Sequence, residues 1–171
     1  IEMMLRNEAD LLICHETEKL PAPIPTSAAI RLLAGRDTMV LAGLPASIDS
    51  LAGGPPLPLL TYPQSSFFGT IIWDQAMPQL TAAFDVETVC ISAFSSALRA
   101  MVLSGLGMAW LPMSLIGPDI KSNLLAAIQP EKFNHPLDIV AYARHPKGND
   151  QDVAMWQHLG HSAMLAEMSW P

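Results

Sequence analysis

Two stretches of the sequence contain residue types that could do acid–base or nucleophilic chemistry. His15 and Glu16 are adjacent, and hydroxyl groups occur at Ser65, Ser66 and Ser92. A histidine, a carboxylate and a serine form the set that activates a hydroxyl nucleophile. The sequence has no Gly-x-Ser-x-Gly segment, which would hold such a serine on a strand-to-helix turn. We therefore expect no catalytic residues and no enzyme.

Metal and redox chemistry have no matching pattern. The five histidines, at positions 15, 135, 145, 158 and 161, are scattered. His158 and His161 are three residues apart, but the next carboxylate is Glu167, so we expect no metal site and no cofactor. Cys14 and Cys90 lie in apolar segments without an adjacent Lys or Arg. They are expected to be buried free thiols in a reducing compartment.

Composition excludes several partners. The chain has 171 residues, half of them hydrophobic and 15% charged, with a net charge of -7. The largest cluster of positive residues is Arg144, His145 and Lys147, so this chain is not expected to bind nucleic acid or an anionic membrane itself. No apolar run reaches the length of about 18 residues that a membrane span needs. The acidic, amphipathic start does not resemble a signal peptide, so we expect a cytoplasmic protein, and a start at Ile1 inside a helix suggests a fragment.

Strand and helix patterns alternate along the chain, which predicts an α/β fold with largely parallel sheets. The strand at 10–14 is expected to be buried on both faces, and residues 35–37 are expected to form a turn between two strands. The expected strands are 10–14, 28–33, 38–42, 59–62, 85–92, 108–111, 124–128 and 137–144. The expected helices are the end of one at 1–8, then 46–51, 67–77, 95–103, 112–120 and 150–168.

The pattern also predicts two lobes. Residues 1–42 and 138–171 are expected to form the first lobe, and residues 43–137 the second. Two crossing strands, 38–42 and 137–141, would join them.

The segment Ser104–Pro112, SGLGMAWLP, predicts a helix-to-strand corner. Gly105 would end a helix, Gly107 would allow a tight turn, and Pro112 would end the strand. The segment lacks the Lys of a phosphate-binding loop, and its glycines follow a helix rather than a strand, unlike a dinucleotide-binding turn.

Taken in order, several segments resemble the effector-binding domain of LysR-type transcriptional regulators. The resemblance covers nearly the whole chain, although Asn7-Glu8 replaces the glycine-containing lead of the first matching strand. Within this family, the chain resembles the hypochlorite-responsive regulators in particular. The matching segments are ADLLICHE (9–16), RLLAGRDTMVLAGLP (31–45), PLLTYPQSS (58–66), SALRAMVLSGLGMAWLP (96–112), LDIVAYAR (137–144) and the helix around Trp156.

The resemblance implies a two-lobed fold of the type 2 periplasmic-binding-protein class, with the first lobe truncated at its N-terminus. It implies a small-molecule effector bound between the lobes. It also implies that DNA is contacted only through an N-terminal helix-turn-helix absent from these residues. The intact protein would be a homo-oligomer, with no membrane partner.

The implied effector site lies near strand C-termini and helix N-termini, where unpaired N–H groups suit small anions. Each candidate has an alternative interpretation: Ser65 and Ser66 as helix caps, His15 as the partner of a loop carbonyl, and Trp110 as core. The candidate effector-binding residues are His15, Glu16, Ser65, Ser66, Ser92, Ala93, Met108 and Trp110.

Two other functions stay open. Ten methionines are present, and Met101, Met108 and Met113 near the corner could sense an oxidant by sulfoxide formation, or simply fill the core. A solute-binding protein of a transporter would have the same two-lobed fold.

Overall fold

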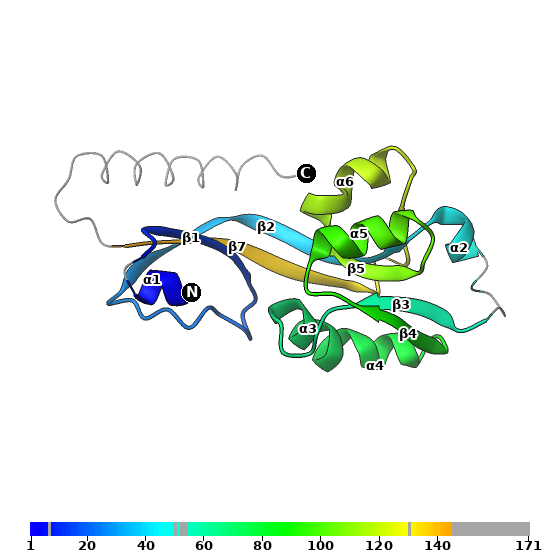
Figure 1. The fold of residues 1–171 in the computed structure, drawn as a ribbon, viewed down its shortest axis with the longest axis horizontal. Coiled ribbons are helices and arrows are strands. Elements are labelled where there is room, and N and C mark those ends of the chain that lie inside the picture. The colour runs from blue at the N-terminus through cyan, green and yellow to red at the C-terminus, as the bar shows by residue number, and fades with distance from the viewer. Residues whose placement is uncertain (7, 50, 52–54, 130, 145–171) are drawn as a thin grey trace. The chain divides into compact units, whose positions relative to one another are not determined.

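Two long strands contribute residues to both parts of the chain. The computed structural model describes residues 1–144 apart from 7, 50, 52–54 and 130. The chain divides into two compact units: unit 1 is Ile1–Asp37 with Pro136–Pro171, and unit 2 is Thr38–His135. β2 (Ala29–Gly43) and β7 (Asn134–Arg144) pass from one unit into the other (Figure 1).

Unit 1 is built on an antiparallel pair of strands. β1 (Leu11–Glu16) pairs with β7 from Leu11 opposite Ala143 to Glu16 opposite Asp138. The short helix α1 (Glu2–Leu5) buries Met4. Met4 belongs to a core cluster with four other buried residues, Ile24, Ala29, Val140 and Tyr142.

The prediction that the first strand is buried on both faces was wrong. Leu12 and Cys14 pack against the core cluster, but Ile13 on the other face is 57% exposed. β1 is the outermost strand at one end of the sheet order, and only one of its faces meets the cluster. The apolar run at residues 10–14 therefore predicted a strand correctly. It did not indicate whether one or both faces of that strand pack against other elements.

The predicted turn at residues 35–37 was also wrong. β2 is one continuous strand of 15 residues. Gly35 does not adopt the positive φ that a tight turn uses; among the described glycines, that conformation occurs at Gly105 and Gly107. The backbone stays extended through these residues because β2 is hydrogen-bonded to neighbouring strands, β7 and β5. The buried Asp37 side chain contacts His15.

Unit 2 has a mixed sheet rather than the largely parallel one expected. β3 (Leu57–Thr61) is parallel to both β4 (Val86–Ile91) and β5 (Met108–Pro112). β2 runs antiparallel to β5 and to the two-residue strand β6 (Ala126–Ala127). Two neighbouring strands can be parallel only if a crossover connection joins them. In unit 2, helices form such connections between β3 and β4 and between β4 and β5. The strand expected at 124–128 is reduced to β6.

Helices cover both sides of the unit 2 sheet. In Figure 1, α5 and α6 lie on one side of these strands, and α3 and α4 lie on the other. The helix expected at 67–77 extends to residue 81 and contains a π-helical stretch, η1. Arg99 of α5 forms a two-point ion pair with Asp119 of α6, with N···O distances of 2.6 and 2.7 Å. The helical segments are α2 (Pro45–Asp49), α3 (Phe67–Ile71), η1 (Ile72–Ala76), α4 (Met77–Thr81), α5 (Ser95–Leu103) and α6 (Met113–Lys121).

The corner between α5 and β5 confirms the prediction for Ser104–Pro112. Gly105 has φ +81°, its N–H bonds to the Val102 carbonyl, and the Leu106 N–H bonds to the Met101 carbonyl. This pair of bonds defines a Schellman motif. β5 ends at Pro112 and α6 starts at the next residue.

Two further predictions concern the C-terminal region and membranes. The helix expected at 150–168 lies outside the described residues. Within the described part of the chain, no helix is long and apolar enough to cross a membrane.

Candidate functional site

Glu16, the last residue of β1, has a carboxylate that is fully engaged inside unit 1. The residue is 1% exposed. Oε1 accepts hydrogen bonds from the Ala22 N–H at 2.7 Å and from the Tyr142 hydroxyl. Oε2 accepts from Nε and Nη2 of Arg31 at 3.0 and 2.8 Å. Glu16 therefore joins β1, the following loop, β2 and β7.

The protonation states of this network follow from its contacts. Burial raises the pKa of Glu16, but the hydrogen bonds from Tyr142, Ala22 and Arg31 outweigh it, so the pKa is lowered overall. Burial and the bond to Glu16 raise the pKa of Tyr142 to about 12. At neutral pH, the network consists of a carboxylate, a neutral phenol and the Arg31 guanidinium.

His15 is the more accessible of the two predicted residues in unit 1. Its Nε2 lies 3.2 Å from Oδ2 of Asp37. The His15 side chain is 27% exposed, whereas that of Asp37 is 2% exposed. A carboxylate partner at this distance orients the imidazole ring. Asp37 could not be identified from the sequence pattern, because it lies 22 residues from His15 and only the strand pairing brings it close.

Ser66 and Ser65 occupy the turn before α3 and differ in their surroundings. The Ser66 hydroxyl donates to the Pro63 carbonyl at 2.8 Å and accepts from the Gly69 N–H at 3.0 Å. Ser66 is thus the N-cap of α3, which supports the alternative interpretation of that residue. Ser65 is exposed.

Ser92 and Ala93 follow β4 at the same edge of the sheet where β3 ends, because the two strands are parallel. The Ser92 N–H donates to the Thr61 carbonyl at 2.9 Å, and the Ser92 hydroxyl accepts from the Phe94 N–H at 3.3 Å. Ala93 is exposed. The structure therefore brings the loop of Ser92 to the end of β3.

Tyr62 connects the loops at this edge and was not among the predicted residues. Its hydroxyl donates to Oγ of Ser95 at 2.9 Å, and its carbonyl accepts from Nε1 of Trp73 at 3.3 Å. Its ring lies 5.2 Å from the Phe68 ring, between centroids. Burial raises the pKa of Tyr62 to about 12. A tyrosine at a strand end was the only sequence signal for this role.

Trp110 and Thr61 carry buried polar atoms without a hydrogen-bond partner. Thr61 Oγ1 and Trp110 Nε1 are two of the three such side-chain atoms in the described part of the chain. Both residues are 0% exposed. Leu60 pairs with Ala109, so Thr61 and Trp110 occupy the next register position on neighbouring strands. Buried polar groups normally find a partner in the protein or in bound water or ligand.

Met108 lies at the opposite edge of the unit 2 sheet from Ser66 and Ser92. It is the first residue of β5, pairs with Leu59 and is 1% exposed. The structure therefore separates Met108 from the predicted residues at the C-terminal strand ends.

No group of three or more His, Cys, Asp or Glu side chains that could hold a metal occurs among the described residues. Hydroxyl, indole and amide groups lie near the strand ends of unit 2, where they could donate hydrogen bonds to a small polar molecule.

Comparisons with known proteins identify the family of this chain. A family model described as the LysR substrate binding domain matches residues 1–162. The chain belongs to this family of LysR substrate-binding domains, which have the type 2 periplasmic-binding-protein fold.

Two relatives from Escherichia coli are each 29% identical over 105 residues, or 61% of this chain. One is the HTH domain-truncated transcriptional regulator QseD, from strain O157:H7, and the other is the HTH-type transcriptional regulator YjiE, from strain K12. The matched region spans 43% and 34% of their respective lengths.

The regulatory domain of HypT from Salmonella typhimurium has a similar fold. Its apo form is 20% identical with a TM-score of 0.78, over 96% of this chain and 77% of that chain. Its bromide-bound form is 21% identical with a TM-score of 0.76, over the same shares of the two chains. HypT is described as a hypochlorite-specific LysR-type transcriptional regulator.

Proposed function

We propose that this chain is the effector-sensing regulatory domain of a LysR-type DNA-binding transcriptional regulator. A small effector, a small anion or metabolite, would bind at strand ends and favour one conformation by its differential affinity. DNA would be contacted by a helix-turn-helix outside these 171 residues, in a cytoplasmic homo-oligomer. The proposal includes no catalytic step.

One observation carries this proposal beyond family membership. The C-terminal ends of β3 and β4 are joined by the Ser92–Thr61 bond, and the buried polar atoms of Thr61 and Trp110 remain unpaired there. α5, which starts after Ser92, has no side-chain cap at its N-terminus. Unpaired donors and an uncapped helix start favour an anionic or polar ligand. The bromide-bound form of HypT provides a precedent for a small anion in a related domain.

The test is thermal unfolding of the 171-residue chain against a panel of small anions and amino acids. A ligand at about 100 times its Kd should add roughly 2.7 kcal/mol to the free energy of unfolding. We expect one class of compound to raise the Tm, and Ser92→Ala and Thr61→Val to weaken the effect.

Ser104→Ala is the matched control, because Ser104 follows the other end of α5 and its hydroxyl donates to the Met101 carbonyl there. It should keep the full ligand response. The proposal would be contradicted if no compound raises the Tm, or if Ser92→Ala and Ser104→Ala respond alike.

A second candidate function is oxidant sensing by methionine. Met101 and Met113 are half-buried, whereas Met108 is buried, so the first two thioethers are the more accessible of the three. Burial, with a smaller contribution from Glu16, raises the pKa of Cys14, which disfavours its thiolate. Methionine is therefore a better candidate than Cys14 for reversible oxidation.

This alternative is tested by treating the chain with about one equivalent of hypochlorite and mapping the sulfoxides by mass spectrometry. We expect oxidation at Met101 or Met113 to change the Tm, and methionine sulfoxide reductase to restore it. Oxidation that leaves the Tm unchanged would argue against methionine sensing.

A further inference from the structure

β4 is the least covered of the three parallel strands in unit 2. It stands at one end of the sheet order, and among the described strands it pairs with β3. None of its six residues is buried, whereas four of the five residues of β3 and all five of β5 are buried. A strand at the end of a sheet also leaves one row of backbone N–H and C=O groups without strand partners. β4 therefore has an open edge and side chains that the rest of unit 2 does not cover.

The uncovered side chains at this edge are largely apolar. Val89 and Ile91 are 45% and 57% exposed, and they lie on the same face of β4 because they are two residues apart. Phe94, which follows the strand, is 71% exposed, more than any other large hydrophobic residue in the described part of the chain. We call these three residues the β4 strip. Neighbouring exposed apolar residues of this kind mark a surface that contacts another molecule.

The charges beside the β4 strip lie at one end of it and are negative. Asp85 and Glu87 precede the strip, and the segment from Thr88 to Leu98 carries no charge. If two copies of β4 met in parallel, their carboxylates would lie side by side. In an antiparallel contact, the acidic start of each strand lies beside the uncharged end of the other. A twofold axis between two copies produces this antiparallel arrangement and closes the assembly as a dimer. The strip is therefore complementary to itself.

We propose that the β4 strip is a contact surface between two copies of this chain, with the two β4 strands antiparallel about a twofold axis. In the alignment that places Val89 opposite Ile91 of the second copy, Cys90 lies opposite Cys90 of the second copy. The proposal rests on the homo-oligomer of the proposed function and names a surface that joins its copies. It involves no effector, so the ligand experiments above and the experiments below can fail independently of each other.

The first experiment measures the mass of the 171-residue chain in solution by sedimentation velocity over a range of concentrations. We expect the mass to rise with concentration toward that of two chains. A mass of one chain throughout the range would overturn the proposal, and a different protein would then be what covers the strip.

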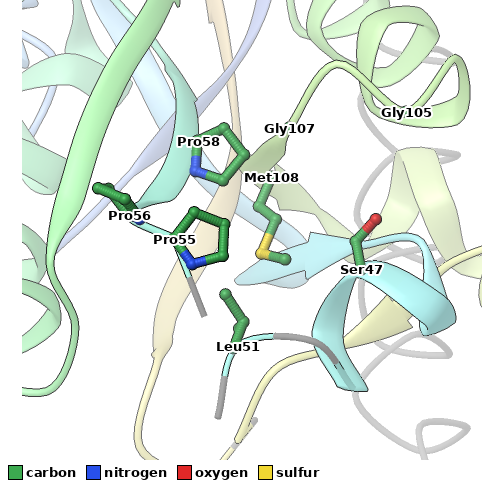
Figure 2. A pocket seen from close by; sticks show the side chains of 8 residues that line it. All are labelled: Ser47, Leu51, Pro55, Pro56, Pro58, Gly105, Gly107 and Met108. Atoms are coloured by element: carbon green, nitrogen blue, oxygen red, sulfur yellow. The ribbon is translucent and has the colours of Figure 1, made fainter. Parts of the chain in front are cut away.

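Two variants locate the contact. Ile91→Glu should raise the Kd of the dimer by about tenfold or more, because each dimer would bury two carboxylates without a partner. Leu106→Glu is the matched control, since Leu106 is 59% exposed and Ile91 is 57% exposed. Leu106 lies between Gly105 and Gly107, whose positions beside Met108 are shown in Figure 2, at the start of β5 and at the opposite end of these parallel strands from Ile91. An equal Kd for the two variants would overturn the proposal.

Disulfide formation tests the alignment without a change in β4. The chain has two cysteines, so Cys14→Ser leaves Cys90 as its one thiol, and Cys90→Ser leaves Cys14. Directly opposed residues of antiparallel strands have Cβ atoms about 4.5–5.5 Å apart, and a small shift brings them within the reach of a disulfide. With diamide as the oxidant, Cys14→Ser should form a covalent dimer on a non-reducing gel, and Cys90→Ser should not. The same yield of covalent dimer in both variants, or none in either, would overturn the proposed alignment.

Discussion

The Tyr142 hydroxyl donates a hydrogen bond to Oε1 of Glu16, joining residues that are 126 positions apart in the sequence. This contact lies within unit 1 and belongs to the network that also includes Arg31 and the Ala22 N–H. It gives one predicted effector residue a role in holding the unit together.

Glu16→Gln should destabilise the chain by about 2–3 kcal/mol, because hydrogen bonds to a buried charge are lost or weakened while Arg31 keeps its charge. Urea unfolding measures this difference. Glu18→Gln is the control, since Glu18 is exposed and only two residues away. Equal stability of the two variants would contradict the structural role of Glu16.

The same network predicts loss of stability in acid. The pKa of Glu16 in the folded chain lies below its ordinary value of 4.5, and the Arg99 hydrogen bond lowers the pKa of Asp119 below 3.8. Their contributions are present above these ordinary values and are lost as the pH falls through the folded-state pKa. Urea midpoints should therefore decrease below about pH 4.5, and Glu16→Gln should reduce that decrease. A pH-independent midpoint in this range would contradict the assignment.

Both tyrosines of the chain should titrate abnormally. Tyr62 and Tyr142 are its only two tyrosines, and burial raises the pKa of each to about 12. Absorbance near 295 nm should show phenolate formation at about pH 12 in the folded chain and near pH 10 after unfolding. Since the unfolded state releases these protons first, stability should fall between pH 10 and 12. Normal titration near pH 10 in the folded chain would show that the two phenols are not buried as described.

Ser66 and Ser65 provide a paired test of capping against ligand contact. Ser66→Ala removes the cap of α3 and should cost about 1 kcal/mol. Ser65→Ala should change stability by less than about 0.5 kcal/mol, because its side chain is exposed. Chemical denaturation measures both. If Ser65→Ala weakens ligand binding without a stability change, Ser65 contacts the effector.

Gly69 should not tolerate a side chain. A Cβ there would lie 1.8 Å from the Pro63 carbonyl oxygen, so Gly69→Ala should destabilise the chain by about 3 kcal/mol or more. Gly117→Ala is the control: nothing other than its chain neighbours lies within 4 Å of its Cβ position in α6, so it should change the free energy of unfolding by less than about 1 kcal/mol. Similar behaviour of the two variants would contradict the close approach at Gly69.

Local features were the ones that could be predicted from sequence. α5 and its glycine corner were predicted with the observed bounds, because helix propensity, capping and positive φ are set by neighbouring residues. The continuity of β2 could not be predicted, since it depends on pairing with β7 and β5, which are far away in the sequence. The exposed face of β1 was missed for a similar reason: a hydrophobic run does not reveal what covers each face.

In the candidate site, too, local features could be predicted from the sequence and long-range contacts could not. The positions of Ser66 and Ser92 at strand ends follow from the pattern of strands and helices. The unpaired atoms of Thr61 and Trp110 depend on the register between β3 and β5, which no short segment encodes. Met108 is the first residue of β5, so it lies toward the end where β5 begins, two residues before Trp110.

The start of α3 also defines a signature that can be searched for. Pro63 supplies the carbonyl, Ser66 bonds to both that carbonyl and the Gly69 N–H, and Gly69 leaves the space empty that a side chain would fill. The three residues are spaced by three and depend on one another. The pattern Pro-x-x-Ser-x-x-Gly after a short buried strand should therefore mark the same strand-to-helix connection in other chains, even where the remaining sequence has diverged.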